Sequence, residues 1–163
     1  MPGCGGSSSS ARAPRSGSWL ALGSNAISSS CSARSAATAP PRVSPCECDF
    51  AAGRLFVSMM WRSRKAIDLL RDPRIAVHSV TTNKEGADGD VKIYGHSVDE
   101  RDPDVRAAFR EAIRRRIDWA PDEPEYHCFS VDVRSAGYTR FGGEAEAVAW
   151  DEERGLRRLS PPG

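Results

Sequence analysis

The chain has 163 residues, of which 28% are charged and 39% hydrophobic, and its formal net charge is +1 at pH 7. This length suits one domain, and because no run of about 18 apolar residues occurs, no membrane-spanning segment is expected. Four of the 23 basic residues precede Glu47, the first acidic residue, which leaves 19 basic residues against 22 acidic ones. That balance does not indicate a nucleic-acid-binding protein.

Residues 1–39 are rich in Ser, Ala, Gly and Arg and lack periodic apolar positions. Such a segment buries too little apolar surface to offset its chain entropy, so we expect it to be disordered and the folded domain to span residues 40–163. A segment rich in Arg and Ser and free of acids is also typical of a transit peptide. A third interpretation is that this segment is not the natural start of the domain.

From Arg42 onward the pattern becomes regular. Residues 42–50 and 54–60 predict two strands joined by a glycine-containing turn. A short helix follows, with Ser63 as its N-cap and Asp72-Pro73 as its end.

The next elements are a strand over residues 74–82 and another over residues 91–98, where Gly95 indicates a bulge or a close backbone approach. The second helix has Asp102 as its cap, Pro103 at its first position and apolar residues at helical spacing as far as Ile117. Residues 125–159 predict three or four more short strands. About seven strands and two helices, with short connections, favour a mainly β protein built as an antiparallel barrel.

Three cations stand at the start of the first helix. Arg62, Arg64 and Lys65 occupy the end of the helix where the dipole favours acids, by roughly 0.3–1 kcal/mol each. The second helix carries its arginines, residues 114–116, at the end where they are favoured. Solvated surface charge is one interpretation of the first cluster. The other is an anion site, most naturally for a phosphate, in which a bound dianion reverses the local electrostatics.

The segments "PRVSPCECDFAAGRLFVSMMWRSRKAIDLLRDPRIAVHS", "GDVKIYGHSV" and "YHCFSVDV" resemble the pyridoxamine 5'-phosphate oxidase-related flavoproteins. The resemblance runs from about Pro41 to Leu159. It implies a split β-barrel that binds FMN, usually as a homodimer with the flavin at the subunit interface. A small-molecule substrate is then expected, and no membrane or nucleic-acid partner.

The same resemblance implies roles for individual residues. Arg and Lys of the "SRK" motif hold the flavin phosphate in that family. The end of the preceding strand lies along the flavin, and an Arg that follows a Pro on the first strand also contributes to flavin binding. The cofactor-binding residues implied here are Arg42, Ser58, Met59, Ser63, Arg64 and Lys65. Glu47 and Asp90 stand where the true oxidases carry Lys and Gln, so flavin binding is expected more firmly than pyridoxine-phosphate oxidation.

The leading functional hypothesis is an FMN-dependent oxidoreductase, because a flavin carries the redox chemistry and needs no acid–base constellation from the protein. No catalytic residue is identified: paired carboxylates and a Ser–His–Asp order are absent, and His127 and Cys128 are interpreted as core or rim residues. One alternative keeps the barrel but binds a deazaflavin or haem. Another is a non-catalytic sensor or interaction module.

The five cysteines form no CxxC pair and no zinc spacing, so neither a metal site nor a disulfide framework is expected. We interpret them as free thiols of a reducing compartment, the cytoplasm.

Members of the resembled family carry a helix and then an apolar strand before the "PRV" strand. The stretch "SSSCSARSAATAP" has no β-branched alternation in that place. We therefore expect that strand to be missing, as it would be after an incorrect start or a shifted reading frame, and its neighbours to expose an unpaired edge.

Overall fold

A computed structural model describes residues 28–33, 42–79 and 84–160, with the backbone alone for residues 28–33. The strands are β1 (Ser28–Ala33), β2 (Arg42–Ala51), β3 (Arg54–Met60), β4 (Arg74–Ser79), β5 (Asp90–Asp99), β6 (Tyr126–Arg140), β7 (Glu146–Asp151) and β8 (Gly155–Leu159). The helices are α2 (Arg64–Arg71) and α3 (Pro103–Ile117).

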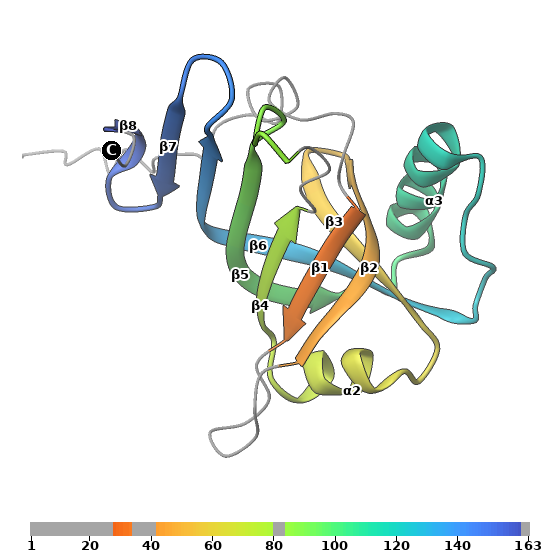
Figure 1. The fold of residues 1–163 in the computed structure, drawn as a ribbon. Coiled ribbons are helices and arrows are strands. Elements are labelled where there is room, and N and C mark those ends of the chain that lie inside the picture. Colours follow the sequence, from red (N-terminus) through yellow and green to blue (C-terminus); the bar gives the residue numbers. More distant parts are fainter. Residues whose placement is uncertain (1–27, 34–41, 80–83, 161–163) are drawn as a thin grey trace, which may run out of the picture.

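The sheet closes on itself. Its strand order is β3-β2-β1-β4-β5-β6-β7-β8, and a further pairing of β3 with β6 turns the first six strands of that order into a barrel. All of these pairs are antiparallel. The 15-residue β6 pairs with β3 through its first part and with β7 through its last part, so β7 and β8 extend the sheet beyond the barrel (Figure 1). The predicted antiparallel barrel is confirmed, and residues 125–159 form three strands, of which β6 is longer than expected, with 15 residues.

Strand β1 corrects the prediction for the N-terminal segment. It lies between β2 and β4 and pairs with both, so the strand expected to be missing is present (Figure 1). The sheet therefore begins before the boundary predicted at residue 40. The physical reason is that a ladder is made by main-chain N–H and C=O groups, which a Ser-rich stretch also possesses. The rest of the segment, 1–27 and 34–39, lies outside the described residues.

Two apolar clusters hold the barrel together. One fills its interior and includes Leu55, Val57 and Met59 of β3. The other lies between α3 and the outside of the barrel, where Phe56 meets Phe109. Because β3 is covered on both faces, five consecutive residues from Leu55 to Met59 are buried. Among the described residues, no helix is long and apolar enough to cross a membrane.

Both helices begin where the sequence predicts. The side chain of Asp102 accepts a hydrogen bond from the N–H of Asp104 at 2.9 Å, and Pro103 occupies the first turn of α3. Ser63 is the N-cap residue of α2, but its side chain makes no capping hydrogen bond. Helix α2 lies at one end of the barrel and α3 along its side (Figure 1).

Candidate active site

The link from β3 to α2 is a tight turn. The N–H of Ser63 donates to the carbonyl of Met60 at 3.1 Å, and Arg62 between them has φ = 54°. A left-handed conformation costs a non-glycine residue roughly 1–2 kcal/mol. The turn places Trp61 on one side, at the rim of a pocket, and directs the chain into α2. Backbone strain of this kind occurs at functional sites more often than elsewhere.

The predicted phosphate-binding cations have different partners. Arg42 donates from Nε to a carboxylate oxygen of Asp68 at 2.7 Å, and Nζ of Lys65 donates to the carbonyl of Pro45. Both contacts connect β2 to α2, and so they bring Arg42 to the helix that carries the other two cations. Arg64 is exposed.

The start of α2 fits a phosphate. The hydroxyl oxygen of Ser63 is buried and has no hydrogen-bond partner. No acid stands in the first turn, and the first N–H groups of any helix have no partner within it. An unpartnered buried hydroxyl costs about 1–3 kcal/mol, and a phosphate at this helix start would supply its missing partner.

Ser58 and Met59, which the resemblance places along the flavin, are each 2% exposed. Met59 belongs to the cluster inside the barrel, together with Ala66 and Leu69 of α2. Their side chains therefore contribute to the core of this chain. Their part in binding a flavin remains a prediction.

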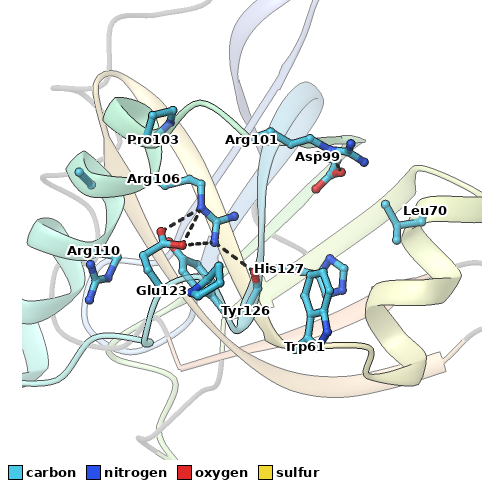
Figure 2. A pocket seen from close by; sticks show the side chains of 12 residues that line it. Trp61, Leu70, Asp99, Arg101, Pro103, Arg106, Arg110, Glu123, Tyr126 and His127 are labelled. Atoms are coloured by element: carbon cyan, nitrogen blue, oxygen red, sulfur yellow. Dashed lines mark hydrogen bonds and ion pairs between the residues drawn. The ribbon is translucent and has the colours of Figure 1, made fainter.

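A pocket of about 710 Å³ lies beside this turn, between α3 and the junction of β3 with β6 (Figure 2). That size is typical of sites for small molecules. Its charged lining residues are Arg101, Arg106 and Arg110 against Asp99 and Glu123, which leaves one positive charge in excess. Within the described parts of the chain, no group of three or more metal-binding side chains is found.

Arg106 is held in the pocket by several contacts. Its Nε and Nη2 groups donate to the Glu123 carboxylate at 2.9 and 2.8 Å, and its guanidinium lies 4.1 Å from the centre of the Tyr126 ring (Figure 2). It also donates to the carbonyl of Glu100 at 3.2 Å. The hydrogen bond from Arg106 lowers the pKa of Glu123, so the pair stays charged near neutral pH.

An aromatic stack forms the opposite wall. The indole of Trp61 lies on the imidazole of His127 with centroids 4.6 Å apart and planes at 13° (Figure 2). On its other side His127 stacks with Phe129, with centroids 5.9 Å apart. His127 is 8% exposed and Trp61 is 56% exposed. Nε2 of His127 is buried and has no hydrogen-bond partner.

Burial lowers the pKa of His127 below its usual 6.5. Below pH 6.5 the His127 imidazole therefore binds a proton in the unfolded chain but not in the folded chain. The free energy of unfolding falls as the pH falls through that range. His127→Gln should weaken the pH dependence of the free energy of unfolding, measured by urea denaturation between pH 5 and 7.5. The exposed His96 offers the matched control, His96→Gln. If both variants keep the slope of the parent, His127 is not the group responsible.

The sequence interpretation missed this pocket. It treated His127 as a core or rim residue and gave Trp61 and Arg106 no role. The register of β3 with β6 pairs Met60 with Tyr126, and this long-range pairing brings Trp61 to His127. A pattern among neighbouring residues in the sequence does not reveal this pairing.

No family description and no curated protein matches the sequence. Solved structures do match its fold. A pyridoxamine 5'-phosphate oxidase-related, FMN-binding protein from Nostoc punctiforme matches with a TM-score of 0.65 and 13% identity, over 93% of this chain and 100% of that one. A NimC/NimA family protein from Clostridium acetobutylicum matches with a TM-score of 0.60 and 15% identity, over 83% and 90%.

A haem-binding protein from Mycobacterium smegmatis matches with a TM-score of 0.59 and 16% identity. The match covers 78% of this chain and 54% of that one, so this chain spans about half of that protein's length. Identities this low establish the fold alone. The chain therefore has the split β-barrel fold found in pyridoxamine 5'-phosphate oxidase-related proteins.

Proposed function

We propose that this chain binds FMN, with the flavin phosphate at the start of α2, and acts as an FMN-dependent oxidoreductase on a small molecule. The observation that carries the proposal is the buried, unpartnered hydroxyl of Ser63 at an acid-free helix start that bears Arg64 and Lys65. A phosphate dianion would accept from this hydroxyl, from first-turn N–H groups and from the cations, and charge-assisted bonds of this kind are the stronger class. One of the matched structures, from Nostoc punctiforme, is described as an FMN-binding protein, which supports the choice of ligand.

When bound, a flavin would supply the hydride chemistry at its ring. The residues of this chain would then bind and orient it. Arg64 would meet the phosphate directly, while Lys65 would give up or share its contact with the Pro45 carbonyl. Arg42 would lie beside the helix, where its ion pair with Asp68 offsets its charge, so Arg64 and Lys65 would supply the net positive charge.

A homodimer is part of the proposal. A flavin that lies on one barrel needs a second surface to exclude water, and a second copy of this chain would provide it through a two-fold interface. Light scattering of the flavin-loaded protein at micromolar concentration is expected to give twice the chain mass of 17.7 kDa. A monomer that keeps its flavin would contradict this arrangement.

Replacing Lys65 with Glu is expected to abolish FMN retention, because a repelling charge would replace a cation beside the phosphate. Arg64→Ala is expected to weaken binding as well. FMN titration followed by flavin fluorescence gives the affinities, and thermal unfolding shows that each variant is folded. Arg115→Ala, an exposed arginine at the far end of α3, is the control and should bind as the parent does. A folded Lys65→Glu variant with the affinity of the parent would refute the phosphate assignment.

Haem and a deazaflavin are the competing ligands, and one matched structure is a haem-binding protein. Mass spectrometry of the ligand that co-purifies with the native protein separates the three. Turnover of a bound flavin with a nicotinamide donor separates an enzyme from a non-catalytic sensor. The buried free thiol of Cys128, whose pKa burial raises to about 12, suits a reducing compartment such as the cytoplasm, which is the proposed location.

A further inference from the structure

Strand β2 leads away from the proposed phosphate site along the barrel wall. Arg42, the first residue of β2, donates to Asp68 of α2 at 2.7 Å. Further along β2, the carbonyl of Pro45 accepts from Nζ of Lys65. These two contacts hold the beginning of β2 against α2. Because a strand rises about 3.3 Å per residue, Glu47 lies roughly 7 Å beyond Pro45, on the side away from α2.

Glu47 faces outward, beside β3. Residues 43, 45 and 47 of β2 are exposed, whereas Cys46 belongs to the cluster inside the barrel, as the alternation of a strand requires. Glu47 pairs with Ser58 of β3. Residues directly opposite one another in an antiparallel pair lie on the same face of the sheet. The carboxylate of Glu47 therefore stands on the outer wall of the barrel, next to Ser58.

This outer wall is largely apolar. Val43 is 70% exposed, Met60 at the end of β3 is 76% exposed, and Pro45 is exposed as well. Exposed apolar side chains beside a phosphate site offer the contact that one face of a flat ring needs. The carboxylate of Glu47 makes no hydrogen bond or ion pair with the residues that the structure describes.

We propose that Glu47 stands beside the ring of the bound flavin and lowers the midpoint potential of that flavin. This inference rests on the proposed function, since it needs the flavin phosphate at the start of α2. A ring joined to that phosphate by the ribityl chain would lie over the outer wall of β2 and β3. Glu47 is the only charged residue among the outward positions of that wall, which are 43, 45, 47, 58 and 60.

The charge of the reduced flavin is what the carboxylate acts on. A reduced nicotinamide donor passes two electrons and one proton to the ring as a hydride, so the neutral ring gains one negative charge and the nicotinamide one positive charge. A nearby carboxylate repels the anionic ring and hardly affects the neutral one, and it therefore disfavours reduction. Charge near the ring is one of the means by which proteins tune a flavin. A lower potential makes the bound flavin a stronger reductant, which favours reduction of the substrate over its oxidation.

The midpoint potential of bound FMN, measured against a reference dye without oxygen, tests this inference. Glu47→Gln keeps the shape of the side chain and removes its charge. It should tighten the binding of reduced FMN about tenfold relative to oxidised FMN, since like charges close together at a protein surface repel by about that much. For a two-electron couple this is a rise of about 30 mV, and Glu47→Lys should give a rise of about 60 mV.

The matched control is Glu144→Gln. Glu144 is also an exposed glutamate, but it lies in the turn between β6 and β7, away from α2 (Figure 1), so its variant should keep the potential of the parent. The difference between the parent and Glu47→Gln should shrink as salt is added, because salt screens exposed charges. Thermal unfolding shows that the variants are folded, as is expected for changes at exposed positions.

The outcomes distinguish this inference from the proposed function on which it rests. A parent that binds no FMN would overturn the proposed function, and the role of Glu47 with it. A parent that binds FMN at the same potential as Glu47→Gln, or at a higher one, would overturn the role of Glu47 and leave flavin binding intact. An equal rise in Glu144→Gln would also count against it, since the effect would then come from net charge rather than from a carboxylate beside the ring.

Discussion

Phe109→Ala is expected to lower the free energy of unfolding by about 3–5 kcal/mol, as truncation of a buried Phe usually does. Phe109 is fully buried, and its ring lies 5.6 Å from that of Phe56 on β3. It is the central contact between α3 and the barrel wall, in a cluster that also contains Tyr126 and Cys128. Its loss leaves a cavity that the rigid strands beneath it cannot fill.

Urea denaturation measures the change. Ile117→Ala, on the last turn of the same helix, is the control because Ile117 is 42% exposed and should cost under about 1 kcal/mol. A change below about 1 kcal/mol for Phe109→Ala would show that α3 packs differently.

Gly95→Ala is expected to destabilise the barrel by about 2 kcal/mol or more, at the upper end of what overpacking costs. A Cβ atom at Gly95 would lie 2.2 Å from the carbonyl oxygen of Asp132 and 3.0 Å from its carbon. Both atoms belong to the backbone of β6, so no side-chain rotation relieves the clash. The pairing of β5 with β6 shifts register between Tyr94 and Gly95, which confirms the bulge and close approach that the sequence predicts.

Gly137→Ala is the matched control. Gly137 lies on β6, and the nearest atom to its added Cβ would be the Val148 carbonyl oxygen at 3.9 Å, an ordinary contact. Thermal unfolding of the two variants should therefore separate them by several degrees. Equal melting temperatures would mean that the close approach at Gly95 is absent in solution.

Local chemistry explains why the helices could be predicted closely. Asp102 and Pro103 mark the start of α3 through a cap and a fixed φ, and both effects act within one turn. For α2 the position of Ser63 was correct but its role was not, because its hydroxyl does not bond to the helix it precedes. Because this hydroxyl is buried and has no partner, Ser63 is a candidate phosphate ligand as well as the N-cap residue.

The candidate site was predicted in part. Helical spacing and charge placed Arg64 and Lys65 at a helix start, and the structure keeps them there. The contacts of Arg42 with Asp68 and of Lys65 with Pro45 join residues 26 and 20 positions apart, which a local pattern does not reveal. The burial of Met59 likewise depends on α2 covering that end of the barrel.

From Arg42 onward, the sequence by itself determined seven strands, two helices and their order, because alternation, helical periodicity and caps are properties of neighbouring residues. Tertiary structure alone decided that β1 fills the gap between β2 and β4, since a main-chain ladder needs no particular side chains. It also decided that Trp61 covers His127. Those residues are distant in the chain and meet only because β3 and β6 close the barrel.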